Sequence, residues 1–347
     1  MKKLAMIGCG GIGSYHLEHF LEYRDVELAG FCDLIPERAQ AFAEKTGGRA
    51  YTDFRRMYDE VQPDMVFICV PPTQHGDIEL ETIRRGIHMF VEKPVALDLN
   101  LARRIRDEAQ KAGIITASGF QCRYSNIVVP TRSFINEHEV VFVQCARIGG
   151  MPDVPWWRQR STSGGQIVEQ TIHQFDLIRY VFSEPDTVFT MGTKGFIKGV
   201  PGYDTEDLTV TVVRFKSGAL MAISTGCYAE NGEAFDSKIT FGARDARLDH
   251  YLLDKVLIHG KAAEQEYASG LVVKGDGTMR AGNGNALTHT DDGSAGVVCD
   301  RTFVNAVLTG DASCIRSPYA DAVRTLSFTL SCNNSMDRNQ PVKVELD

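Results

Sequence analysis

The sequence predicts an α/β protein whose N-terminal part is a doubly wound parallel sheet. Over the first 120 residues, short apolar runs alternate with segments of helical periodicity. The apolar runs are nearly unbroken, which is typical of parallel strands that helices cover on both faces. After residue 120 the strand-like stretches alternate apolar and polar positions, as antiparallel strands do. We therefore expect an N-terminal domain over 1–120 and a C-terminal domain over 121–347.

In the N-terminal domain, apolar runs predict strands at 4–7, 26–33, 65–70, 88–91 and 114–117. Helical periodicity predicts helices that start near Ile12 and Pro36, and further helices at 75–86 and 100–112. Pro36 suits a helix start because the N–H of the first turn has no partner there anyway.

The C-terminal domain mixes helices with strands of alternating polarity. We expect a loop rich in Pro and Trp over 151–163 and a long polar loop over 275–296. Helices are predicted near 127–136, from about 165, near 300–309 and at 319–337, and strands at 140–148, 208–215, 219–223 and 342–344.

The composition narrows the possible partners and the compartment. The chain has 347 residues and a net charge of -8. Nucleic acids and anionic membranes bind basic surfaces, so this acidic balance argues against both as partners. No apolar run reaches the roughly 18–20 residues that span a bilayer, and the apolar run at the start is too short for a signal peptide. The nine cysteines form no CxxC pair and are expected to be reduced. These features predict a soluble cytoplasmic protein with no nucleic-acid or membrane partner.

A glycine-rich turn between the first strand and first helix predicts a dinucleotide site. Gly8 permits the tight turn, Gly10 lets the backbone approach a pyrophosphate, and Gly13 lets the helix pack closely on the strand. Asp33 lies about 20 residues further on, where a carboxylate accepts hydrogen bonds from the adenosine ribose and repels a 2′-phosphate. No base adjoins it, so NAD is favoured over NADP, although Arg38 weakens that preference.

Two further motifs make the chain resemble the Gfo/Idh/MocA oxidoreductases (glucose–fructose oxidoreductase, inositol dehydrogenase and relatives). They are Pro71-Pro72-Thr73-Gln74-His75 and Glu92-Lys93-Pro94, with a Gly-Gly…His…Asp segment in the second domain. The resemblance covers essentially the whole chain. It implies an NAD-binding Rossmann domain, followed by a substrate-binding α/β domain with a large open, mostly antiparallel sheet. It also implies a homo-oligomer, a dimer or a tetramer.

Lys93 ends an apolar parallel strand, at the edge of the sheet where ligands bind in open α/β folds. The resemblance places this lysine between the nicotinamide and the substrate. Beside the positive ring of the cofactor its pKa should be lowered, and its amine can bridge to the reacting hydroxyl.

Glu169, His173 and Asp176 share one face of the helix predicted from about 165, because they are four and three residues apart. The resemblance implies that His173 is the general acid or base. The family usually has Asp where this chain has Glu169, which puts the role of Glu169 in doubt. A metal site from the three side chains and a purely structural histidine are the alternatives, and Asp176 is equally compatible with a structural role. We expect no metal, and we interpret His16 and His19 as ordinary helix residues.

The predicted site residues fall into three groups. Catalysis is assigned to Lys93, His173 and Glu169. Substrate contact is assigned to Lys93, Arg123, Tyr124, Trp157, Arg158, Glu169 and His173. Cofactor contact is assigned to Gly8, Gly10, Gly11, Ile12, Gly13, Asp33, Arg38, Pro71, Thr73, His75, Glu92, Lys93 and Gln121.

The function hypothesis is an NAD-dependent dehydrogenase that moves a hydride to or from a hydroxyl carbon of a sugar, polyol or inositol. His173, tuned by Glu169, would take the hydroxyl proton while Lys93 polarises the oxygen. One alternative is a redox-neutral, NAD-dependent glycosidase or lyase on the same cofactor site. Another is a non-catalytic sensor of NAD or sugar.

Overall fold

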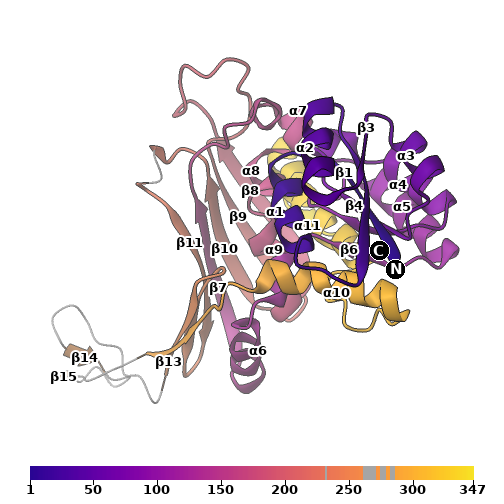
Figure 1. Cartoon of the computed structure of the whole chain (residues 1–347). Coiled ribbons are helices and arrows are strands. Elements are labelled where there is room, and N and C mark those ends of the chain that lie inside the picture. The colour runs from indigo at the N-terminus through magenta and orange to yellow at the C-terminus, as the bar shows by residue number, and fades with distance from the viewer. Residues whose placement is uncertain (231–232, 261–270, 274–278, 282–285) are drawn as a thin grey trace.

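The computed structural model describes residues 1–230, 233–260, 271–273, 279–281 and 286–347. Two sheets stand side by side with helices packed between and around them (Figure 1). Part of the polar region predicted as a loop over 275–296, namely 275–278 and 282–285, lies outside the described residues.

The first sheet has six parallel strands in the order β3-β2-β1-β4-β5-β6. Because the order reverses between β1 and β4, the carboxyl ends of these two strands flank a crevice in which open α/β sheets bind ligands. The strands are β1 Lys2–Ile7, β2 Val26–Cys32, β3 Arg49–Tyr51, β4 Met65–Ile68, β5 His88–Val91 and β6 Thr116–Ser118. The helices are α1 Gly11–Phe20, α2 Pro36–Thr46, α3 Phe54–Val61, α4 Asp77–Arg84 and α5 Leu99–Ala112, with the 3-10 turns η1 Pro72–Gln74 and η2 Gln121–Tyr124.

The second sheet has nine strands in the order β16-β13-β12-β11-β7-β10-β9-β8-β17. Its neighbours are antiparallel except for β7 and β10. The strands are β7 Val140–Ile148, β8 Pro185–Thr193, β9 Leu208–Phe215, β10 Leu220–Gly226, β11 Asp236–Ala243, β12 Arg247–Tyr251, β13 Lys255–His259, β16 Leu287–Thr290 and β17 Val342–Lys343; β14 Leu271–Val273 and β15 Met279–Ala281 form a separate pair. Its helical segments are α6 Val128–Glu137, η3 Pro155–Arg158, α7 Arg160–Ser163, α8 Gly165–Glu169 and α9 Ile172–Val181.

The last two helices, α10 (Ala295–Thr309) and α11 (Tyr319–Arg338), return to the first sheet. Phe303 of α10 packs edge-on against Phe67 of β4, with ring centroids 5.4 Å apart. Leu326 of α11 is fully buried in the core that also holds Val66 and Val91. Residues from the end of the chain therefore complete the N-terminal core, and the division at residue 120 stays a prediction.

The predicted fold class is confirmed, while three local predictions need correction. The continuous helix from 165 is broken between α8 and α9, because the Thr171 N–H reaches back to Gln166 O (2.9 Å) and its hydroxyl bonds Thr225 of β10. The predicted loop over 275–296 contains the edge strand β16, and α10 already begins at Ala295. The sequence analysis also predicted neither β3 and α3 of the first domain nor the strands β8, β11, β12 and β13 of the second sheet.

Within the described residues, no helix combines the length and apolarity that crossing a bilayer requires.

Candidate functional site

The glycine-rich turn has the geometry that a pyrophosphate site needs. Gly8 adopts φ +93°, and a Cβ there would lie 2.2 Å from Cys69 O. A Cβ on Gly13 would lie 2.3 Å from Gly8 O, so helix α1 could not approach β1 with a larger residue. The start of α1 has no side-chain cap and no acidic residue in its first turn. Its N–H groups are therefore left for an anion, and the turn fits the predicted cofactor.

Asp33 lies directly beside this turn. Its Oδ2 accepts the Cys9 N–H (2.8 Å), and its Oδ1 accepts the Ile35 N–H (2.8 Å). These bonds fix the carboxylate at the carboxyl end of β2, where an adenosine ribose would reach it. Arg38 Nη1 lies 3.8 Å from the position that a Cβ on Gly10 would take, so the guanidinium extends over the same turn.

The Pro-Pro-Thr-Gln-His motif follows β4 and forms the turn η1. Pro71 and Thr73 are exposed on it, whereas His75 is buried. His75 Nδ1 hydrogen-bonds Glu79 Oε1 (2.6 Å), and its Nε2 is buried without a partner in the described part of the chain. The motif thus holds a buried imidazole, oriented by Glu79, shortly after the carboxyl end of β4.

A pocket of about 180 Å³ lies where α1, β5, α9 and α10 meet. It joins residues from the predicted cofactor site to residues from the predicted catalytic site. It is lined by Ile12, Tyr15, His16, Phe90, Glu92, Lys93, Gly119, Gln121, His173, Gly296, Cys299 and Asp300.

Lys93 and Glu169 form an ion pair at this pocket. Lys93 Nζ donates to Glu169 Oε1 (2.8 Å) and to Glu169 O (2.9 Å). An ammonium group has three donors, so one N–H has no partner among the residues described. Burial alone would raise the pKa of Glu169, but the Lys93 charge and several hydrogen bonds outweigh burial and lower the pKa. Glu169 is thus a fixed carboxylate that anchors the lysine.

Trp157 also holds Glu169, and this contact changes the role predicted for Trp157. The ring is fully buried, and its Nε1–H donates to Glu169 Oε2 (2.8 Å). A fully buried indole offers no face to a sugar, so substrate contact by Trp157 has no support in this structure. Arg158 is partly exposed, its Nη2 lies 3.5 Å from Asp153, and its Nε is buried without a partner within the described ranges.

His173 lines the pocket from α9. Burial, followed by the charges of Lys93 and Arg147, lowers its pKa to about 3. The ring is therefore neutral at pH 7 and can accept a proton. Its Nδ1 is buried with no partner in the part of the chain that the structure describes. The charges that act on it are Lys93 and Arg147, so the expectation that Glu169 tunes His173 directly is not supported.

His16 contacts Glu92 and Asp300, which both line the pocket. Its Nδ1 lies 2.8 Å from Asp300 Oδ2 and its Nε2 lies 3.1 Å from Glu92 Oε1. Burial alone would lower its pKa, but Asp300 and Glu92 raise it to about 10. The imidazolium fixes Glu92, whose Oε2 accepts the Lys93 N–H (3.0 Å). His19 Nδ1 also bonds Asp300 Oδ2 (2.6 Å). His16 is therefore part of the pocket wall, contrary to its interpretation as an ordinary helix residue.

Gln121, a predicted cofactor ligand, lines the same pocket. Its Oε1 accepts the hydroxyl of Tyr15 (2.7 Å). The sequence analysis missed Tyr15, His16 and Asp300. A helix residue one turn after the glycine motif could have suggested His16, but Asp300 lies 284 positions further along the chain and gave no signal.

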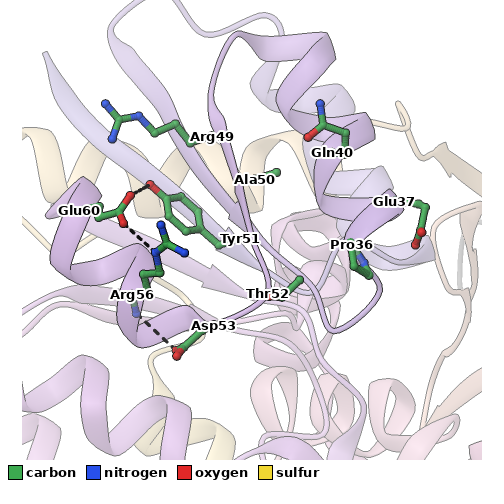
Figure 2. A pocket seen from close by; sticks show the side chains of 10 residues that line it. All are labelled: Pro36, Glu37, Gln40, Arg49, Ala50, Tyr51, Thr52, Asp53, Arg56 and Glu60. Atoms are coloured by element: carbon green, nitrogen blue, oxygen red, sulfur yellow. Dashed lines mark hydrogen bonds and ion pairs between the residues drawn. The ribbon is translucent and has the colours of Figure 1, made fainter.

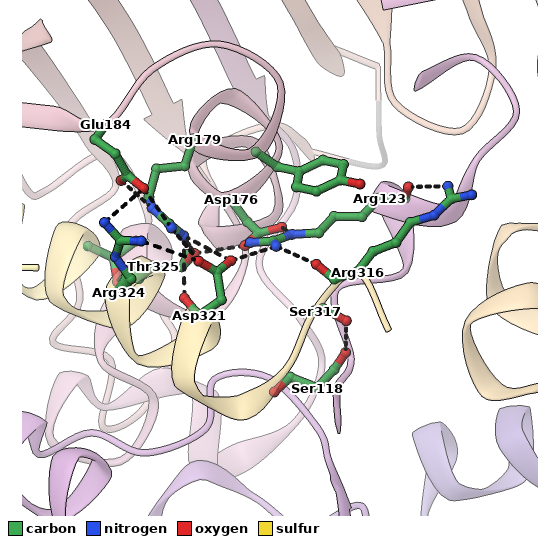
Figure 3. A network of polar contacts seen from close by, with 12 residues as sticks. Ser118, Arg123, Asp176, Arg179, Glu184, Arg316, Ser317, Asp321, Arg324 and Thr325 are labelled. Atoms are coloured by element: carbon green, nitrogen blue, oxygen red, sulfur yellow. Dashed lines mark hydrogen bonds and ion pairs between the residues drawn. The ribbon is translucent and has the colours of Figure 1, made fainter. Parts of the chain in front are cut away.

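Arg123, Tyr124 and Asp176 lie outside the pocket. The Arg123 side chain is buried, with Nε 2.7 Å from Asp176 Oδ2 and Nη1 2.5 Å from Asp321 Oδ2. The Tyr124 hydroxyl contacts Ser317 (3.3 Å). Figure 3 shows Arg123 and Asp176 inside a polar network that joins η2, α9 and α11. Because Asp176 bonds Arg123, the three side chains of the alternative metal site do not converge. Substrate contact by Arg123 and Tyr124 likewise has no support.

A larger, more open hollow of about 760 Å³ lies between α2, β3 and α3 (Figure 2). Glu60 accepts hydrogen bonds there from Tyr51 (3.1 Å) and Arg56 (2.8 Å). No residue predicted for the site lines it, so it is separate from the Lys93 pocket.

Comparison with known proteins finds family models that match both parts of the chain. Residues 2–120 match the family model described as "Oxidoreductase family, NAD-binding Rossmann fold", and residues 139–248 match the "GFO/IDH/MocA C-terminal domain".

Among named relatives, the myo-inositol 2-dehydrogenase of Thermotoga maritima is 29% identical over 246 residues, which are 70% of this chain and 73% of that protein. The D-glucoside 3-dehydrogenase of Escherichia coli is 28% identical over 244 residues, 64% of this chain and 69% of that one.

Solved structures with the same fold include a levoglucosan dehydrogenase in complex with NADH, with a TM-score of 0.83, 16% identity and 99% of both chains covered. They also include a probable dehydrogenase from Thermotoga maritima, with a TM-score of 0.77, 23% identity, and 99% of this chain and 98% of that chain covered. The chain belongs to the Gfo/Idh/MocA family of NAD-dependent oxidoreductases.

Proposed function

We propose that this protein is a dehydrogenase that transfers a hydride between NAD and a hydroxyl-bearing carbon of a sugar, polyol or inositol. The observation that carries the proposal is the meeting of Ile12, Lys93 and His173 at one pocket. Ile12 follows the glycine turn, and the other two side chains offer a hydrogen-bond donor and a proton acceptor. The relatives that act on inositol and glucosides support this choice of substrate class.

The chain's own groups would divide the work as follows. The free N–H of Lys93 donates to the reacting hydroxyl oxygen, while Glu169 and Trp157 hold the lysine in place. The neutral imidazole of His173 takes the hydroxyl proton, which general base catalysis requires. Bound NAD supplies the hydride acceptor at the carbon. In this scheme Glu169 is a positioning group, because its carboxylate is ionised and fully engaged.

The remaining cofactor contacts follow from the placement of the turn. The N–H groups at the start of α1 would bind the pyrophosphate, and Asp33 would bind the ribose hydroxyls. Glu92, Gln121 and His75 would line the nicotinamide end.

The experiment is a screen of sugars, inositols and glycosides with NAD and with NADP, following absorbance at 340 nm and product together. Formation of a keto product with stoichiometric NADH supports the dehydrogenase. Cleavage of a glycoside without net NADH would replace it with the redox-neutral lyase. Undetectable turnover, despite tight NAD binding, would favour a sensor.

We also propose a cytoplasmic homo-oligomer that associates through the outer face of the nine-stranded sheet. Exposed apolar side chains lie beside one another there, since Val210 pairs with Met191 and Leu220 pairs with Phe142. The described cysteines are all unpaired, in keeping with a reducing compartment. Light scattering of the purified protein tests the assembly.

A further inference from the structure

Arg147 is a cation beside the candidate site that has no anionic partner. It lies near the end of β7, and its Nη2 donates a long hydrogen bond to Gln170 Oε1 (3.4 Å). Its Nη1 is buried and has no hydrogen-bond partner among the described residues. Within the same residues, no carboxylate lies within 4.0 Å of the guanidinium. A buried donor of this kind costs free energy unless a ligand satisfies it.

Among the described residues the two buried arginines are paired, whereas Arg147 is half-buried. Arg123 contacts Asp176 and Asp321, and Arg179 contacts Glu184 and Asp321, as Figure 3 shows. Carboxylates outweigh burial and raise the pKa of Arg179. At Arg147 burial dominates, and the pKa is lowered although Glu169 opposes the shift. Among the described residues the Arg147 guanidinium therefore lacks a carboxylate partner, and its charge acts on His173 from outside the lining of the 180 Å³ pocket.

The position of Arg147 ties it to the Lys93 pair. Gln170 accepts from Arg147 and itself donates to Glu169, the anchor of Lys93. Both cations act on His173, whose pKa they help to lower. The guanidinium also lies over the ring of Phe235, with its Cζ 5.3 Å from the centroid. Glu169 is therefore linked to both cations, to Lys93 directly and to Arg147 through Gln170.

The backbone accommodates this orientation of the side chain. A Cβ on Gly149 would lie 2.2 Å from Arg147 Nη1, so a larger residue there would require the guanidinium to move away from the strand.

We propose that Arg147 binds an anionic group of the substrate, a carboxylate or a phosphate, and so makes an acidic sugar or sugar phosphate the preferred substrate. This inference rests on the proposed dehydrogenase function and narrows its substrate class. A planar guanidinium binds either group through paired N–H···O bonds. The shared chemistry is a negative group on the substrate, away from the carbon that loses the hydride.

The test compares kcat/KM for matched pairs of substrates that differ in one anionic group. The probes are glucose with glucuronate, glucose with glucose 6-phosphate, and myo-inositol with myo-inositol phosphate. The wild type is expected to prefer the anionic member of at least one pair by about 10- to 100-fold, the value of a hydrogen bond to a charged group. The pair that shows the preference distinguishes carboxylate from phosphate.

In Arg147→Gln that preference should disappear, mainly through a higher KM for the anionic member. The readout is the ratio of kcat/KM within each pair, because removing a charge that acts on His173 changes the rate on both members. Arg147→Lys keeps the charge but lacks the planar fork, and should retain part of the preference. The matched control is Arg244→Gln, at an exposed turn with a side chain 76% exposed. NAD binding and thermal melting of each variant show that it is folded.

The outcomes separate the two proposals. Equal rates on both members of every pair, or an equal loss on both in Arg147→Gln, would overturn the role of Arg147 and leave the dehydrogenase intact. Failure of every substrate in the panel, with NAD still bound, would overturn the dehydrogenase itself.

Discussion

Lys93 Nζ lies 2.8 Å from Glu169 Oε1, and this pair connects the end of a strand in the first sheet to a helix that packs on the second. Neither side chain is exposed enough for solvent to screen the pair strongly, since 15% of the Lys93 side chain and 8% of the Glu169 side chain are accessible. The contact therefore fixes the relative position of the two halves at the pocket.

Lys93→Ala should lower turnover at least about 100-fold, because it removes the donor to the reacting oxygen. Glu169→Gln should lower kcat less, since the amide oxygen still accepts from the ammonium. Steady-state rates with a defined substrate measure both effects. An alanine variant with near-normal kcat would exclude the assigned role of Lys93.

His173→Ala should also lower turnover at least about 100-fold. Because burial and the charges of Lys93 and Arg147 lower the His173 pKa to about 3, kcat/KM should show no limb from this residue near pH 6.5. The same shift affects stability. In the unfolded state His173 is protonated below about pH 6.5, whereas in the folded state the imidazole stays neutral until about pH 3. The free energy of unfolding therefore falls as the pH drops toward 3.

Denaturant titrations of the wild type and His173→Asn, at several pH values between 3 and 7, measure this contribution. The variant should show a shallower pH dependence in this range, and identical curves for both proteins would contradict it. His138→Asn, at the residue that caps the C-terminus of α6, serves as the control.

His16 should show the opposite pH dependence. Its pKa is raised to about 10, because Asp300 and Glu92 outweigh burial. Its contribution to stability is therefore complete below about pH 6.5 and is lost as the pH rises through about 10. Urea titrations between pH 6 and 10 should show a steeper loss of stability for the wild type than for His16→Gln. Parallel curves would mean that the ring carries no extra proton.

Asp33→Ser should increase the use of NADP relative to NAD, because the carboxylate that would repel a 2′-phosphate is gone. Arg38 extends over the same turn and could then pair with that phosphate. The ratio of kcat/KM for the two cofactors should shift toward NADP by about 10-fold or more, in line with one charged hydrogen bond. An unchanged ratio would show that Asp33 does not select the cofactor.

Arg123→Met should lower stability by about 3–5 kcal/mol, since it leaves the buried Asp176 carboxylate without its guanidinium partner and removes one of the guanidinium partners of Asp321. At temperatures where the variant is folded, its KM should stay close to the wild-type value. A large rise in KM with little loss of stability would restore the idea that Arg123 binds substrate.

The local motifs predicted much of the site. The glycine turn and Glu92-Lys93-Pro94 each follow a strand, so their neighbours in sequence are also their neighbours in space. The expected segment with Glu169 and His173 reached the same pocket despite the helix break at Thr171. Their catalytic roles stay predictions.

The parts of the site that the sequence did not predict depend on partners far away in the chain. Arg123 and Trp157 carry polar groups that suit either a substrate or a buried carboxylate, and only the fold brought Asp176 and Glu169 to them. Asp300 and Arg147 lie in segments with no motif of their own. The missed helix α3 was readable, since Asp53 caps it and Phe54, Met57, Tyr58 and Val61 have helical spacing.

The return of α10 to the first sheet has a consequence for the order of events during synthesis. Phe67 and Phe90 emerge from the ribosome more than 200 residues before Phe303, which covers them. Until then this aromatic surface lacks its final cover, and the pocket lacks Gly296, Cys299 and Asp300 from its wall. The pocket is therefore complete only after α10 has been synthesised, so the nascent first sheet should not bind the cofactor as the folded protein does before that point.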